Sequence, residues 1–130
     1  MARNVILAAA LPATAETLFD MYLDAAVHAA FTGAPVTIDR QPGSPFSAFD
    51  GVLTGRMLHT EHGRLIVQTW RSANWTAEDR DSVLTLSFHD GADAGQIELV
   101  HVHVPESDFA GVSHGWETFY WQPWRRFLTE

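Results

Sequence analysis

The sequence predicts an α+β fold in which an antiparallel sheet wraps around a long C-terminal helix. Two short helical segments follow a first strand, a series of strand-like segments comes next, and an aromatic segment ends the chain. In this last segment large apolar residues recur at intervals of three and four, which places them on one face of a helix. These residues are Val112, Trp116, Phe119, Tyr120, Pro123 and Phe127. Such a face needs a partner surface, and the strands supply one.

The first elements are a strand and two short helices. Val5–Ala10 forms an apolar strand that ends before Pro12. A helix begins at Thr14, just after this proline, and its apolar edge predicts burial against the sheet. That edge consists of Leu18, Phe19, Tyr22 and Leu23. A second helix, Ala25–Phe31, ends before Gly33, since glycine is a common stop signal.

The segment from Val36 to Val104 has the alternation and the turn residues of an antiparallel meander. Its predicted strands are Val36–Asp39, Phe46–Thr54, Arg56–Thr60, Arg64–Arg71, Ser82–His89 and Gln96–Val104. The pair Asp50-Gly51, inside the second of these strands, predicts a bulge or bend that lets the sheet curve.

Composition excludes several classes of function. At 130 residues the chain is long enough for one hydrophobic core, and we expect residues 1–130 to form a single domain. The absence of cysteine excludes disulfides and thiol chemistry. The formal charge is −8 and all 8 basic residues are arginine. Binding to nucleic acid or to an anionic membrane surface, both of which require clustered basic residues, is therefore disfavoured.

The N-terminal segment imitates a secretion signal. Arg3 precedes the apolar run Val5–Leu11 and the small residues Ala13–Ala15. The run is short and mostly alanine, however, and cleavage would delete the first strand. No segment approaches the roughly 20 apolar residues of a transmembrane helix. We therefore expect a cytoplasmic protein, and the composition, rich in alanine and arginine and free of lysine, is typical of a GC-rich bacterial coding sequence.

Several motifs along nearly the whole chain resemble the activator-of-Hsp-90-ATPase homologue family. They are Phe46–Gly51 with Gly55-Arg56, Ile66–Arg71, Trp75, Ser82, His101 with Val104-Pro105, and Gly115–Pro123. The resemblance implies a helix-grip fold of the START or Bet v 1-like superfamily, with a cavity between sheet and last helix that holds a small apolar ligand in many relatives. The chain departs from the family at Gly43-Ser44-Pro45, where paired glycines are usual. The eukaryotic cochaperone also has an N-terminal domain, which makes much of its chaperone contact and for which this chain has no room.

Side-chain alternation indicates which residues face the cavity. The inward rows are Ile66, Gln68 and Trp70 on one strand and Leu84, Leu86 and Phe88 on the next. On the last strand alternation alone leaves two choices, and the family resemblance puts the row of Ile97, Leu99, His101 and His103 inside. The opposite row then lies on the outer face of the sheet, where it is a candidate surface for a homodimer. It consists of Val100, Val102 and Val104.

Five residues are candidates for ligand binding. They are Gln68, Trp70, His101, Trp116 and Tyr120. Gln68 and His101 are polar groups in a largely apolar interior, and leaving either unpaired costs about 1–3 kcal/mol. They are satisfied either by hydrogen bonds within the protein or buried water, or by the polar head of a ligand held between apolar walls of Trp70, Trp116 and Tyr120.

The catalytic and metal signatures in the sequence are incomplete. Gly111–Gly115 matches the Gly-x-Ser-x-Gly motif of hydrolases, but it opens a helix and no histidine follows it. His101 and His103 on one strand face would form half of a zinc site, yet a third ligand is missing because His89 falls on the opposite face of its own strand. We therefore predict no catalytic residues, no metal and no cofactor.

Three functions remain, in order of preference. The first is a non-enzymatic, stand-alone bacterial homologue of the C-terminal domain of the Hsp-90 activator that binds a small hydrophobic or aromatic ligand in its cavity. The second is a partner of an Hsp-90-type chaperone that acts through its surface. The third is a cyclase- or hydrolase-like enzyme with His101 as general acid or base.

Overall fold

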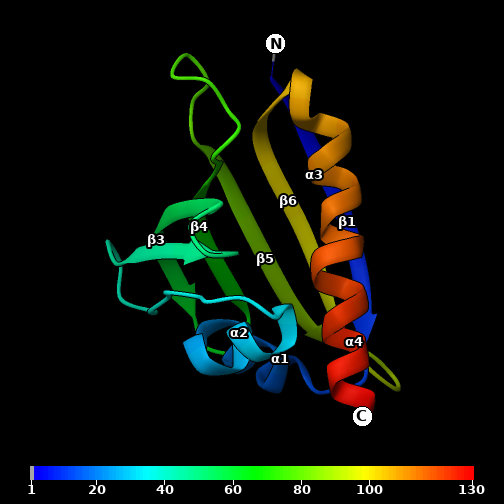
Figure 1. Cartoon of the computed structure of the whole chain (residues 1–130). Helices are drawn as coiled ribbons and strands as arrows, with labels where there is room; N and C mark the ends of the chain where they lie inside the picture. The colour runs from blue at the N-terminus through cyan, green and yellow to red at the C-terminus, as the bar shows by residue number, and fades with distance from the viewer. Residues whose placement is uncertain (1) are drawn as a thin grey trace.

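The computed structural model describes residues 2–130 and shows a six-stranded antiparallel sheet with a C-terminal helix running along one of its faces (Figure 1). The strands are β1 Ala2–Leu11, β2 Pro45–Ala48, β3 Leu53–Glu61, β4 Leu65–Ser72, β5 Ser82–Asp90 and β6 Gly95–Pro105. Their order in the sheet is β1-β6-β5-β4-β3-β2. The predicted fold class, a curved antiparallel sheet around a long C-terminal helix, is confirmed.

Helices cover one face of this sheet. They are α1 Ala15–Leu23, α2 Ala25–Thr32, the short 3-10 turn η1 Glu106–Asp108, α3 Phe109–Gly115, the π-helical segment η2 Trp116–Trp121 and α4 Gln122–Thr129. The last three form one continuous rod along β1 and β6, and α2 packs against its C-terminal half (Figure 1). The hydrophobic core lies between this rod, the two short helices and the sheet. Within residues 2–130 no helix is long and apolar enough to cross a membrane.

The two short helices begin and end where local signals predict. The Thr14 hydroxyl accepts a hydrogen bond from the Thr17 backbone N–H at the start of α1, and the Asp24 carboxylate caps α2 at the Val27 N–H, both over 3.1 Å. The second helix ends at Gly33, whose φ of 83° is the left-handed conformation of a helix C-cap. All four residues predicted on the apolar edge of α1 are buried.

Two predicted strands of the meander are wrong. The segment Val36–Asp39 forms only an isolated bridge, between Thr37 and Ser47. The predicted strand Phe46–Thr54 is divided into β2 and the start of β3, which pair as a hairpin with Ala48 opposite Leu53. The chain reverses at Phe49, Asp50 and Gly51, whose φ angles of 52°, 56° and 88° are all left-handed. Asp50-Gly51 is therefore part of a tight turn and not a bulge inside one strand.

The C-terminal helix buries a different face from the one predicted. Phe119 and Phe127 are 56% and 42% exposed, whereas Trp121 and Trp124 are buried. The cause is the wide π turn, in which the Gln122 N–H bonds to the Glu117 carbonyl. Pro123 has no N–H to donate to the Phe119 carbonyl, and a wider turn accommodates its ring. The extra residue in this turn shifts the buried face by one position.

A second irregularity lies near the end of β6. His103 has a φ of 65°, and the pairing of β1 with β6 shifts register between Arg3 and Val5. Inward and outward positions therefore exchange after His101, so that His103 is exposed and Val104 is fully buried. The predictions that His103 shares the face of His101, and that Val104 lies on the outer face, are both wrong.

Candidate functional site: an aromatic pocket under the last helix

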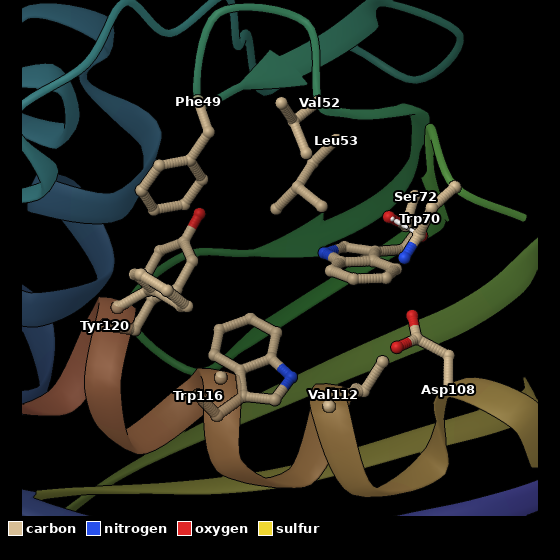
Figure 2. A pocket seen from close by; sticks show the side chains of 13 residues that line it. Phe49, Val52, Leu53, Trp70, Ser72, Asp108, Val112, Trp116 and Tyr120 are labelled. Carbon is tan, nitrogen blue, oxygen red and sulfur yellow. Dashed lines mark hydrogen bonds between the residues drawn. The ribbon is translucent and has the colours of Figure 1, made fainter.

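A pocket of about 360 Å3 lies between the β2–β3 turn and the helical rod (Figure 2). Phe49 and Leu53 form its cover on the turn side, and Trp116 and Tyr120 form its floor on the helix side. Trp70, from β4, closes the pocket from the sheet. Phe119 and Val52 also line it and are half exposed, which places them at its mouth. The volume lies within the range of small-molecule sites, roughly 300–1,000 Å3, and the lining is mostly apolar.

The aromatic rings of the pocket pack against one another and hold its shape. The ring centroids of Trp116 and Tyr120 are 4.6 Å apart, and Phe49 stands edge-on to Tyr120 at 5.8 Å. Such pairs add roughly 0.5–1.5 kcal/mol each to simple area burial. The pocket is therefore largely preformed.

One end of the pocket is polar. Ser72, Asn74 and Asp108 line it there. The Trp75 indole N–H donates a hydrogen bond to Asp108 Oδ2 over 2.7 Å, which ties the loop after β4 to the start of the helical rod. A Cβ atom at Gly111 would lie 2.5 Å from Asp108 Oδ1, so that only glycine leaves room for this carboxylate.

His101 lies directly behind the pocket and connects two of its walls. Its Nδ1 accepts a long, 3.5 Å hydrogen bond from the Trp116 indole N–H, which leaves the proton on Nε2. That proton is donated to Ser82 Oγ over 2.6 Å, and the hydroxyl donates to the Trp70 carbonyl over 2.6 Å. Burial lowers the pKa of His101 to about 3, so the ring is neutral. The histidine positions Trp116 and the backbone of Trp70.

Gln68 is also satisfied within the protein. The Tyr22 hydroxyl donates to Gln68 Oε1 over 2.7 Å, and the side-chain amide donates to the Thr69 carbonyl over 3.3 Å. Of the five candidate residues, Trp70, Trp116 and Tyr120 therefore line the pocket, while Gln68 and His101 lie in the buried layer that supports it.

Sequence reasoning missed His28, which supports the floor of the pocket from α2. Its Nδ1 lies 2.8 Å from the Tyr22 carbonyl, which only accepts, so Nδ1 carries the proton. Its Nε2 then accepts from the Tyr120 hydroxyl over 2.9 Å. Burial lowers the pKa of His28 to about 4. The signal in the sequence that could have identified His28 is its spacing of three from Phe31 on a predicted helix. The two rings are stacked, with their centroids 5.2 Å apart.

Comparison with known proteins decides the family. The family model described as Activator of Hsp90 ATPase homolog 1-like protein matches residues 12–122. The chain belongs to this family. A similar protein is the activator of 90 kDa heat shock protein ATPase homolog of Dictyostelium discoideum, 30% identical over 100 residues, which are 76% of this chain and 26% of that protein. The human homolog 1 is 25% identical over 107 residues, or 82% of this chain and 31% of that protein.

Two solved structures have the same fold. An HSP90 activator from Plasmodium falciparum superimposes with a TM-score of 0.88 at 20% identity, covering 97% of this chain and 96% of the other. A protein from Mesorhizobium loti superimposes with a TM-score of 0.83 at 19% identity, covering 98% and 97%. The chain spans between a quarter and a third of the length of the curated relatives it matches. The homology to Hsp90 activators is therefore shown for the part of those proteins that this chain matches.

Proposed function

We propose that this family member binds a small hydrophobic or aromatic molecule in the pocket between the β2–β3 turn and the helical rod. The observation that carries the proposal is the preformed, aromatic-lined volume of about 360 Å3. Binding would be driven by the burial of apolar surface, about 25 cal/mol per Å2 before the ordering costs of association. No chemistry on the ligand is required.

In this proposal the five candidate residues have two roles. Trp70, Trp116 and Tyr120 contact the ligand directly, since they line the pocket. Gln68 and His101 hold these walls in place from behind, since their hydrogen-bonding groups are engaged with the protein. A ligand therefore meets mostly aromatic surface, with polar groups at the Asp108 end alone.

Calorimetric titration with a panel of uncharged aromatic compounds tests the proposal. We expect binding by the wild type and at least a tenfold loss of affinity in Trp116→Ala, which removes the floor of the pocket. Phe127→Ala is the matched control, because Phe127 is an exposed aromatic residue on the same rod outside the pocket. No binding by any compound, together with an experimental structure in which Phe49 and Leu53 fill the volume, would remove this function.

A second candidate function is interaction with an Hsp90-type chaperone through the surface of the chain. The supporting observation is the similarity to Hsp90 activators, one of which this chain covers almost completely in structure. The test is the ATPase rate of a bacterial Hsp90 with purified protein. Stimulation that persists in Trp116→Ala would support a surface function independent of the pocket, and an unchanged rate at excess protein would exclude it.

The geometry supports an enzyme less well. Both ring nitrogens of His101 are engaged, and its pKa of about 3 keeps it from carrying a second proton near neutral pH. The Ser82 hydroxyl beside it is fully buried and donates to the Trp70 carbonyl, so it is not available as a nucleophile. The motif at Gly111–Gly115 lies in α3, where Ser113 bonds to the Phe109 carbonyl.

A further inference from the structure

One polar atom in the pocket wall has no partner. The indole nitrogen of Trp70 is buried and makes no hydrogen bond to any of residues 2–130. The residue is 6% exposed, and in Figure 2 the nitrogen edge of its ring is turned toward the middle of the pocket, between Leu53 and Trp116. The other two indoles near this pocket donate to His101 and to Asp108. A buried donor without an acceptor costs about as much as a lost hydrogen bond.

The charge of the pocket gives a second and independent constraint. Among the described residues that line it, Asp108 supplies a carboxylate and no arginine is present. The Asp108 carboxylate accepts one hydrogen bond, from Trp75, and is turned toward Trp70 in Figure 2. An anionic group bound beside Trp70 would face this like charge across a largely apolar space, where electrostatic repulsion is stronger than in water.

From these two observations we propose that the pocket selects uncharged aromatic compounds that carry a hydrogen-bond acceptor, and that it discriminates against carboxylates. The acceptor, such as a ketone oxygen, accepts a hydrogen bond from the Trp70 indole N–H. A small rotation of the side chains around the indole nitrogen makes room for this oxygen, and the aromatic part of the ligand lies against Trp116 and Tyr120. The proposal rests on the proposed ligand-binding function and names its ligand class.

Three naphthalenes with side groups of similar size test this inference: 2-acetylnaphthalene, 2-isopropenylnaphthalene and 2-naphthoate. Their affinities are measured by calorimetry for the wild type, Trp70→Phe and Asp108→Asn. The affinity ratio of the ketone to the alkene is compared between proteins, because this comparison cancels the different hydration of the free ligands. We expect Trp70→Phe to lower that ratio about fivefold, the equivalent of one hydrogen bond. An unchanged ratio would overturn the role of Trp70.

Asp108→Asn tests the charge constraint and keeps an oxygen for the Trp75 indole. We expect it to raise the affinity ratio of 2-naphthoate to the ketone about tenfold over the wild type. Wild-type binding of 2-naphthoate as tight as that of the ketone would contradict the proposal.

A measurement on the wild-type protein tests the proposal even if the variants fail to fold. In its 1H–15N spectrum the Trp70 indole proton moves downfield on addition of 2-acetylnaphthalene, as expected for a newly formed hydrogen bond, and not on addition of 2-isopropenylnaphthalene. If no compound binds the wild type, the proposed function itself fails. If all three bind with equal affinity and the same spectral change, only the selectivity fails.

Discussion

The Tyr120 hydroxyl donates a hydrogen bond of 2.9 Å to Nε2 of His28, a residue 92 positions earlier in the chain. This bond joins α2 to the middle of the C-terminal rod, at the floor of the pocket. The other ring nitrogen of His28 donates to the Tyr22 carbonyl, so that a single side chain satisfies polar groups from α1 and from the rod. The two short helices are in this way fixed to the element that carries the ligand site.

Replacing His28 should therefore destabilise the fold strongly. In His28→Ala the Tyr120 hydroxyl and the Tyr22 carbonyl lose a buried partner and a cavity opens beside Phe31, so we expect a loss of about 2–4 kcal/mol in the free energy of unfolding. Urea denaturation measures it. His59→Ala, at an exposed histidine of β3, is the control and should change stability by less than about 0.5 kcal/mol. Equal effects in the two variants would show that the buried bond contributes little.

Stability should also fall in mild acid. Burial lowers the pKa of His28 to about 4 and that of His101 to about 3, from 6.5 in the unfolded chain. Below pH 6.5 the unfolded state therefore binds more protons than the native state, which is the condition for stability to decrease as the pH falls. The expected loss is up to about 1.4 kcal/mol per pH unit for each histidine, between pH 6.5 and about 4. Above pH 7 both contributions are fully present.

The melting temperature between pH 4.5 and 7.5 measures this dependence. His28→Phe removes one of the two groups and should reduce the slope by about half, even if it lowers stability at every pH. A wild-type melting temperature that stays constant down to pH 4.5 would mean that neither imidazole is held neutral by the fold.

Local signals explain which elements could be predicted from the sequence. The caps at Thr14 and Asp24 and the stop at Gly33 act within a few residues, so the helix boundaries were readable. The pocket walls at Trp116 and Tyr120 follow from helical periodicity, which holds as far as the π turn. Pro123 breaks that periodicity. The burial of Trp121 and Trp124, with Phe119 and Phe127 left exposed, follows from a backbone response that a regular 3.6-residue pattern does not contain.

The remaining errors come from contacts between distant parts of the chain. The left-handed conformation of Phe49 is unfavourable for an aromatic residue, and it is maintained because Phe49 packs against the far end of the sequence, at Phe119 and Tyr120. The bulge at His103 depends on the register of β1 against β6. His28 and Asp108 gain their roles from partners that spacing alone does not identify.

Two glycines should respond in opposite ways to alanine. A Cβ atom at Gly55 would lie 2.0 Å from the Thr69 carbonyl oxygen on the neighbouring strand, a backbone atom that cannot move aside without breaking the pairing of β3 with β4. We expect Gly55→Ala to destabilise the fold by more than about 3 kcal/mol. At Gly115, inside the helical rod, the nearest atom is a Phe119 ring carbon at 3.7 Å, an ordinary contact. Gly115→Ala should stabilise the protein by about 0.5–1 kcal/mol.

Thermal and urea unfolding of the two variants check this pair of predictions. Each variant serves as the control for the other, because both add one methyl group to a glycine with ordinary φ. A Gly55→Ala protein as stable as the wild type would mean that the two strands separate more easily there than their pairing indicates.

The outer face of the sheet is the surface on which we predict self-association. Ile6 on β1 is 74% exposed and lies opposite Val100 of β6, which is 38% exposed. The predicted valine row is shorter than expected, since Val104 is buried, and Ile6 on the neighbouring strand is more exposed than Val100. Contact with the same face of a second copy would remove these apolar side chains from water. We expect a concentration-dependent dimer in sedimentation velocity, and a shift to monomer in Ile6→Asp.

Leu58→Asp, at an exposed apolar residue of β3, is the matched control and should leave the equilibrium unchanged. A wild type that remains monomeric up to millimolar concentration would show that these side chains are simply solvated.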